Sequence, residues 1–429
     1  MPRKSIFRYA SMRLIWRLYT QRLSQPGRWF LWASLVIISY GTTSLEIQAY
    51  VPLSYAFSIW SMALVSAVFF RPRMSLKSEH PVRVCAGEKI KVEVDVEHTG
   101  GWGGQGLFIL PHRLPPEIDA EENPAFLPSM TQGQKSRVHV GLHCTRRGVY
   151  TLQGYRVETD YPLGLLRSYQ LFDDTRALIV YPKFQALGRL VLPSGRKHHP
   201  GGVALASPLG DSLEYLGNRE YREGDNLRNI DWRATARLSK PVVREYIEEY
   251  FLRSAVILDT HVSPLKAGRL RRWPSGGQPQ ASPAHDAFER AVSVCASVSD
   301  YMARQDYLVD IFAAGPQLYH LTAGRSLAYL DQILDILACV EANVNEPFDV
   351  IEPEILEHLS KITTIICVFL DWNENRRIFA GKLILQGAGL KIIIVRDLPC
   401  TLDPDLDRAQ FGDIVTVSEK EYNAGLEEI

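Results

Sequence analysis

The chain has 429 residues, 46% of them hydrophobic, so it is too long for one ordinary domain and apolar enough to fold into two or three. Its 48 Lys and Arg residues are balanced by 48 Asp and Glu residues, which excludes the overall basic charge typical of a nucleic-acid-binding protein. The six cysteines form no CxxC pair, which favours reduced, buried thiols in a cytosolic setting.

Two uncharged stretches near the N-terminus predict a transmembrane helical hairpin over residues 29–70. The first stretch, 29–45, has 17 residues, and the second, 47–70, has 24. A helix needs about 17–25 residues to cross a hydrocarbon core of roughly 30 Å, so the first is short and the second is ample. Only Glu46 separates them. The alternative is a buried core hairpin of a soluble protein.

The charges that flank these stretches predict an orientation. The segment 1–28 contains Lys and Arg but no acidic residue, and Arg71, Arg73 and Lys77 follow the second stretch. Because positive charge marks the cytoplasmic side, both termini and all soluble domains are expected in the cytoplasm. The chain is therefore predicted to be a multi-pass protein of the cytoplasmic membrane, which contacts lipid through residues 29–70.

Residues 77–184 contain runs with a two-residue period of apolar side chains, which is typical of strands with one solvent-exposed face. "KIKVEVDVEH" (89–98) and "RVHVGLHC" (137–144) alternate apolar and polar side chains, and turns rich in Gly and Pro separate such runs. We expect a small antiparallel β-sandwich, immunoglobulin-like, that acts as a spacer or interaction module. A linker dense in Gly, Pro and Ser follows at 185–210; its adjacent histidines, 198 and 199, are interpreted as solvated residues.

Residues 211–429 are predicted to comprise a charged segment and, from about residue 250 onward, continuous apolar runs that alternate with helical periods. Runs of this kind are typical of strands covered on both faces, and the alternation predicts a doubly wound α/β domain with a parallel sheet. The predicted strands are 255–259, 307–314, 363–371 and 390–397, and the predicted helices are 285–305, 326–344 and 374–388.

Three predicted strands end in an aspartate: Asp259, Asp371 and Asp397. Because ligands of parallel sheets bind beyond the carboxyl ends of the strands, these side chains are expected at one functional edge. Asp259, Ser263 and Asp371 supply the hard oxygen ligands that Mg²⁺ prefers. "DTHVS" (259–263) is similar to the Asp-x-Ser-x-Ser metal site of von Willebrand factor type A domains, with a histidine in place of the middle serine. The alternative is that these aspartates cap the following helices.

Just before this domain, the stretch "REYREGDNLRNIDWRATAR" (219–237) interleaves arginines and carboxylates. Such spacing favours bidentate ion pairs with fixed geometry. "EGDN" predicts a turn at Gly224, Asp225 or Asn229 can cap a short helix, and Ile230 and Trp232 are expected to anchor that helix on the domain. The stretch is interpreted as a binding surface; the alternative is a structural network satisfied within itself.

The same stretch resembles the signature of the bacterial domain-of-unknown-function 58 family, which reads approximately R-E-Y-x-x-G-D-x-x-R-x-I-D-W-x-x-x-A-R. The matching residues are Arg219, Glu220, Tyr221, Gly224, Asp225, Arg228, Ile230, Asp231, Trp232, Ala236 and Arg237. The resemblance implies two N-terminal spans, a β-rich segment and a type A-like domain after the signature. It also implies a protein partner, a MoxR-type AAA+ ATPase, in protein assembly or remodelling.

These observations predict a membrane-anchored cytoplasmic adaptor rather than an enzyme, with no catalytic residue assigned and Mg²⁺ as the only candidate cofactor. The alternative is a metal-dependent hydrolase or phosphoryl-transfer enzyme that uses the strand-end aspartates. The absence of a GxSxG elbow, a Walker A loop and an HExxH motif weighs against that alternative. A nucleic-acid partner is not expected.

Overall fold

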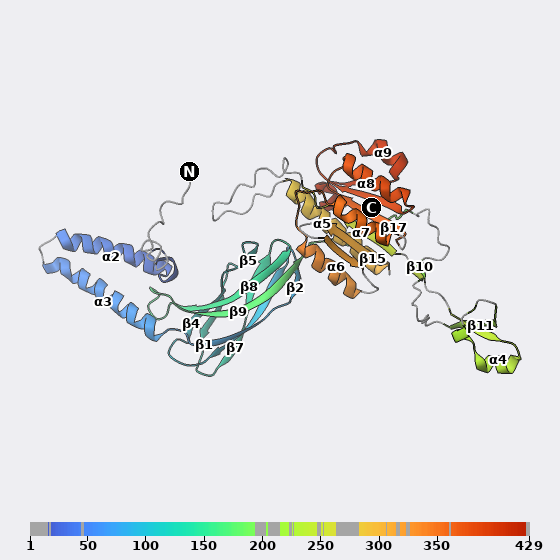
Figure 1. Cartoon of the computed structure of the whole chain (residues 1–429). Helices are drawn as coiled ribbons and strands as arrows, with labels where there is room; N and C mark the ends of the chain where they lie inside the picture. The colour runs from blue at the N-terminus through green and yellow to red at the C-terminus, as the bar shows by residue number, and fades with distance from the viewer. Residues whose placement is uncertain are drawn as a thin grey trace. The chain divides into compact units, whose positions relative to one another are not determined.

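The computed structural model describes residues 16, 19–43, 47–193, 203–204, 215–222, 225, 227–246, 250–251, 253–262, 283–305, 307–314, 318–322, 327–359 and 362–425. The chain divides into two compact units, Met1–Tyr181 and Pro182–Ile429, each with its own hydrophobic core (Figure 1). The finer boundaries expected from the sequence remain predictions. No disulfide joins the six cysteines; Cys144, Cys295 and Cys367 are buried as predicted, Cys85 and Cys400 are partly buried, and Cys339 is exposed.

The first unit begins with two helices, α2 (Gln25–Thr43) and α3 (Ile47–Phe69), which run side by side (Figure 1). Within the described residues one helical segment, Tyr50–Phe69, is long and apolar enough to cross a membrane. The two helices touch through Trp60, whose Nε1 donates a hydrogen bond to Ser34 Oγ at 3.1 Å.

Two β-sheets that share one core complete this unit. The first has the order β1-β3-β7-β5 and the second β2-β9-β8-β4-β6. The alternation of β3 explains the packing, since Val92, Val94 and Val96 are buried and the residues between them are not. The strands are β1 (Met74–Glu79), β2 (Arg83–Cys85), β3 (Lys89–His98), β4 (Gln105–Pro111), β5 (Ile118–Ala120), β6 (Ala125–Ser129), β7 (Lys135–Cys144), β8 (Gly148–Thr159) and β9 (Ser168–Tyr181).

The second unit contains a six-stranded sheet of order β16-β15-β14-β17-β18-β19, parallel except for β16. The four predicted strands are present as β14 (Arg253–Leu258), β15 (Leu308–Ala314), β17 (Thr364–Phe369) and β18 (Gly389–Val395). Two shorter strands, β16 (Leu318–Thr322) and β19 (Ile414–Val417), were not predicted and form the edges.

Helices cover this sheet. The three predicted helices are α5 (Pro283–Arg304), α6 (Leu327–Cys339) and α8 (Glu374–Leu385); α7 (Phe348–His358), α9 (Pro404–Phe411) and α10 (Glu419–Ala424) are additional. Apolar residues of α7, α8 and α9 form one core with alternate residues of the strands, such as Ala255 and Ile257. The residues between them, including Val256, are also fully buried, and α5 packs against the same strands. Burial on both faces explains why the strand sequences do not alternate.

The signature stretch folds locally as a β-hairpin with helical turns at its tip. Strands β11 (Tyr215–Glu220) and β12 (Val242–Tyr246) pair antiparallel, and between them lie the 3₁₀ turn η2 (Leu227–Asn229) and the helix α4 (Trp232–Leu238). Short strands β10 (Val203–Ala204) and β13 (Tyr250–Phe251) pair separately.

Candidate functional site

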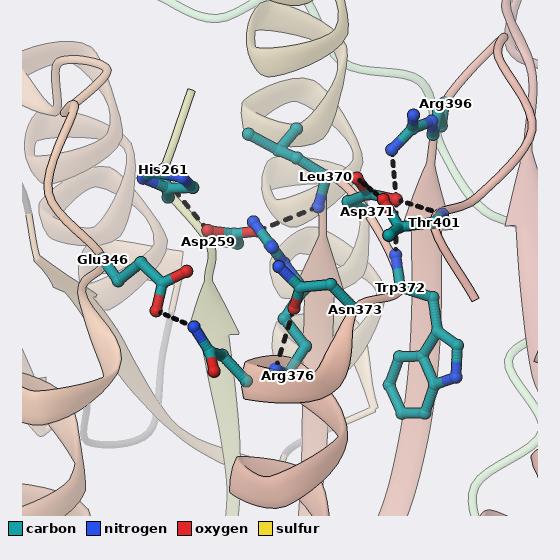
Figure 2. Close-up of polar contacts among 11 residues, drawn as sticks. Asp259, His261, Glu346, Leu370, Asp371, Trp372, Asn373, Arg376, Arg396 and Thr401 are labelled. Carbon is teal, nitrogen blue, oxygen red and sulfur yellow. Dashed lines mark hydrogen bonds and ion pairs between the residues drawn. The ribbon is translucent and has the colours of Figure 1, made fainter. Parts of the chain in front are cut away.

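The strand-end aspartates lie where the sequence predicted, directly after or two residues beyond the carboxyl ends of β14, β17 and β18. Figure 2 shows Asp259 and Asp371 at this edge, with the side chains that contact them. The geometry of each carboxylate decides what it can bind.

Asp259 is fully buried and both of its carboxylate oxygens accept hydrogen bonds. Oδ2 accepts from Nε of Arg376 at 2.8 Å, from Nη2 of the same guanidinium at 2.6 Å and from the backbone N–H of Leu370 at 3.0 Å. Oδ1 accepts from the backbone N–H of His261 at 2.9 Å (Figure 2). Arg376, itself 2% exposed, enters from the first turn of α8, which Asn373 caps. The guanidinium therefore neutralises this carboxylate within the core.

Asp371 is held in a second cluster of donors. Its carboxylate pairs with Nη1 of Arg396 and accepts from Oγ1 of Thr401 at 2.8 Å, from the Thr401 backbone N–H at 3.0 Å and from the Trp372 backbone N–H at 2.9 Å (Figure 2). Burial raises the pKa of Asp371, but the hydrogen bonds from Arg396 and Thr401 outweigh it and bring the pKa to about 2. The carboxylate is therefore ionised at neutral pH.

Asp397 repeats the pattern at the end of β18. Its Oδ2 pairs with Nη2 of Arg290 from α5, and its Oδ1 accepts from the backbone N–H of Glu419 at 2.7 Å. Each strand-end aspartate is thus paired with an arginine that another element of the second unit supplies. None of these three arginines was predicted; the neighbouring Arg376 and Arg377 in the first turn of the helix after Asp371 were the available signal.

These hydrogen bonds and ion pairs restrict Mg²⁺ binding at the predicted site. Ser263 lies outside the described residues. A cation bound by Asp259 would have to displace the Arg376 guanidinium, and one bound by Asp371 would have to displace Arg396. Magnesium binding by Asp259, Ser263 and Asp371 therefore remains a prediction.

In the signature hairpin, Arg219 and Asp225 form the bidentate pair that the sequence predicted. Nη1 and Nη2 of Arg219 donate to the two carboxylate oxygens at 2.7 and 2.8 Å, and the backbone N–H of Arg222 adds a third hydrogen bond at 2.8 Å. The hydrogen bonds from Arg219, then from Arg222, lower the pKa of Asp225 to about 2. Gly224, the expected turn residue, lies outside the described residues.

Asp231 caps α4 and also ties it to the hairpin. Its Oδ1 accepts from the backbone N–H groups of Arg233 and Ala234 at 3.1 and 3.0 Å, and its Oδ2 accepts from Nε of Arg244 on β12 at 3.3 Å. The hydrogen bond from Ala234 is the largest cause of the lowered pKa of Asp231. The cap predicted at Asp225 or Asn229 is thus at Asp231 instead.

Backbone hydrogen bonds and one exposed ion pair close the base of this tip. The backbone N–H of Tyr221 donates to the Pro241 carbonyl at 2.9 Å, and Nζ of Lys240 lies 3.0 Å from a carboxylate oxygen of Glu220. Arg228 lies in η2 with an exposed side chain. These contacts make the stretch a folded element of fixed shape.

The outward face of α4 carries apolar and basic side chains together. Trp232 is 71% exposed, so the expectation that its indole is anchored by burial is wrong. Residues 232, 233, 236 and 237 lie within an arc of about 140° at about 100° per residue, and the buried Ala234 lies outside this arc. We call the exposed side chains of Trp232, Arg233, Ala236 and Arg237 the α4 surface. Within the described residues no carboxylate pairs with Arg233 or Arg237.

Comparison with known proteins points to one family. Residues 217–269, which include most of the hairpin and all of β14, match the family "Protein of unknown function DUF58". The chain is also 27% identical over 154 residues to "Uncharacterized protein YeaD" of Bacillus subtilis (strain 168). That alignment covers 35% of this chain and 32% of the relative, so the chain spans about a third of the relative's length. The two matches support membership of the DUF58 family, as the signature predicted.

Proposed function

We propose that this protein is an adaptor of the cytoplasmic membrane that binds a protein partner through the α4 surface, with its soluble parts in the cytoplasm. The observation that carries the proposal is an exposed tryptophan, Trp232, beside two exposed arginines, Arg233 and Arg237, on a hairpin in which the carboxylates of Asp225 and Asp231 are already paired. Trp and Arg are the residues most enriched at the energetic centres of protein interfaces.

The contacts between α2 and α3 support a hairpin anchor in the membrane. Small residues are buried at seven-residue spacing on both helices, Ser34 and Gly41 on α2 and Ala56 and Ala63 on α3. Small side chains let membrane helices approach closely. Most large apolar residues of both helices are exposed, as they are when lipid surrounds a helical pair.

Aromatic residues at the end of α3 support the same anchor. Phe70 contacts Trp102 and Tyr161, with ring centroids 6.0 and 5.3 Å apart, and Trp102 is 70% exposed. Exposed Trp and Tyr beside the basic residues Arg71 and Arg73 are typical of the boundary between hydrocarbon and water. The positive flanks favour the cytoplasmic side for this boundary.

The α4 surface restricts the chemistry of the partner. Arg233 and Arg237, which no carboxylate pairs with in the part of the chain that the structure describes, favour an acidic surface, and the indole favours an apolar pocket. The ion pair of Arg219 with Asp225 and that of Asp231 with Arg244 hold the α4 surface in one shape before the partner binds. This order reduces the entropic cost of association. By resemblance, the partner is a MoxR-type AAA+ ATPase and the six-stranded domain is type A-like.

The ion pairs between the strand-end aspartates and arginines favour an adaptor over a metal-dependent enzyme. Arg376 and Arg396 occupy the positions in which a catalytic cation would sit against Asp259 and Asp371. A hydrolase site would need an open coordination position at this edge. Such arginine–aspartate pairs instead stabilise the loops that follow the strands.

Co-purification from solubilised membranes tests the proposal. Tagged full-length protein should recover an AAA+ ATPase, and Trp232→Ala or Arg237→Ala should reduce recovery at least tenfold with unchanged membrane content. Val149→Ala is the control, because Val149 is also exposed, at 53%, but lies in the other unit and outside the helical pair. Unchanged recovery by both α4 variants contradicts the α4 surface as the binding site, and reporter tags found outside the cell contradict the cytoplasmic orientation.

A further inference from the structure

Two histidines and a glutamate come together where the edge strand β16 meets α7. His320 lies in the middle of β16, and Glu354 and His358 lie one turn apart on α7. The ligand atoms of the three side chains all lie within 4.8 Å of one another, and each side chain is partly exposed. This cluster was not predicted from the sequence.

The hydrophobic core fixes the orientation of both elements. Ile351 and Ile355 of α7 are fully buried in the core, and this rotation of the helix directs Glu354 and His358 to the same side. On the sheet, His320 is the cross-strand partner of Phe312, and the two rings stack with centroids 4.4 Å apart. The imidazole is therefore held against a buried aromatic ring.

The distances fit a metal ion that three protein ligands share. Nδ1 of His320 lies 2.9 Å from Oε1 of Glu354, and Nε2 of His358 lies 3.8 Å from the same oxygen. Ligands about 2.0–2.2 Å from a tetrahedral zinc ion lie about 3.4 Å from one another, which is between these two distances. We propose that His320, Glu354 and His358 form a Zn²⁺-binding site that joins β16 to α7.

The donor set selects the metal. Two imidazoles and one carboxylate suit Zn²⁺, whereas Mg²⁺ prefers oxygen ligands in an octahedral shell. Three protein ligands leave one coordination position for water or for a group from another molecule. The stacked ring of Phe312 restrains His320, as residues around metal ligands commonly do. This site shares no residue with the α4 surface or with the strand-end aspartates.

Metal titration of the untagged, metal-free full-length protein in detergent tests the site. We expect one Zn²⁺ per chain by calorimetry, a rise in melting temperature on Zn²⁺ addition, and the visible absorption of tetrahedral Co²⁺ when Co²⁺ replaces it. Glu354→Gln and His358→Ala should each weaken binding about tenfold or more and remove the Co²⁺ absorption. The melting temperature of each metal-free variant shows that it is folded.

Two controls separate this site from other histidines. His285 and Glu289 are also one helical turn apart, with a distance of 3.5 Å, and no third ligand joins them among the described residues. His285→Ala and the double change of the histidines at 198 and 199 should therefore leave binding unchanged. The proposal is overturned if the unaltered protein binds no Zn²⁺, if Glu354→Gln binds as tightly, or if a control variant loses the site.

Discussion

Arg376 and Asp259 form an ion pair inside the second unit, with 2.6 Å between Nη2 and Oδ2 and side chains that are 2% and 0% exposed. The pair joins the first turn of α8 to the end of β14. Two further contacts embed it: the Leu370 backbone N–H donates to the same oxygen, and the guanidinium lies over the Phe348 ring at 5.6 Å from its centroid.

Arg376→Ala should destabilise the second unit by about 3–5 kcal/mol, because it leaves the Asp259 carboxylate buried without its counter-charge. Urea unfolding of the full-length protein, followed by the fluorescence of the buried Trp372, measures the change. Arg377→Ala is the matched control, since Arg377 is the next residue on α8 but is 41% exposed in its pairs with Glu374 and Asp407. Equal losses from both variants would contradict a special contribution of the buried pair.

The lowered pKa of Asp371 predicts how the free energy of unfolding depends on pH. Its pKa falls from an ordinary 3.8 to about 2 in the folded chain, so the unfolded chain binds a proton first as the pH is lowered. The stabilisation is therefore complete above about pH 4 and is lost as the pH falls toward 2, with a total of about 2 kcal/mol. Unfolding free energies measured between pH 5 and pH 2 should fall less steeply for Asp371→Asn than for the unaltered chain. Parallel curves would show that Asp371 does not carry this pH dependence.

The parallel strands could be predicted because their burial leaves a direct mark on the sequence. Every residue of β17 and β18 is buried, and their apolar runs are continuous as a result. The edge strand β16 has half-exposed residues such as His320, and α7 contains Pro353, so neither shows a clear period. Both were missed for that reason.

The positions of the strand-end aspartates could also be predicted, but their partners could not. Asp259 and Arg376 are 117 residues apart, and only the tertiary fold brings α8 to the end of β14. Bidentate pairs within residues 219–237 were predicted from the close spacing of arginines and carboxylates, and Arg219 and Asp225, six residues apart, form one; which residues pair was not predicted. Burial of Trp232 was expected from its apolar character, yet an apolar residue can remain exposed.

Asp231→Ala and Arg237→Ala should separate the shape of the α4 surface from its chemistry. Loss of the Asp231 side chain removes the hydrogen bonds to the backbone N–H groups of Arg233 and Ala234, so hydrogen exchange of these amides should accelerate. Arg237→Ala keeps the cap, so the same amides should exchange at the unaltered rate. Both variants should lose the partner in co-purification. Faster exchange in Arg237→Ala would show that this side chain also stabilises α4.

Gly27→Ala should loosen the start of α2 from the loop between β8 and β9. A Cβ atom at Gly27 would lie 2.0 Å from the Leu165 carbonyl oxygen, and Ser24 next to it accepts from the Gly27 backbone N–H at 3.0 Å and donates to the Leu165 carbonyl at 3.1 Å. Because the obstacle is backbone, the helix must move away, at a cost of about 1–3 kcal/mol.

Hydrogen exchange measured by mass spectrometry can localise this effect. Peptides that contain Ser24 or the loop residues around Leu165 should exchange faster in Gly27→Ala, while those of β3 and β7 should not change. Gly381→Ala in α8 is the control, because a Cβ atom there meets nothing within 4 Å and alanine raises helix propensity by about 1 kcal/mol. Unchanged exchange around Ser24 would mean that α2 is not held by this contact, and the membrane anchor would then have to be coupled to the sandwich through α3 and the aromatic contacts of Phe70 alone.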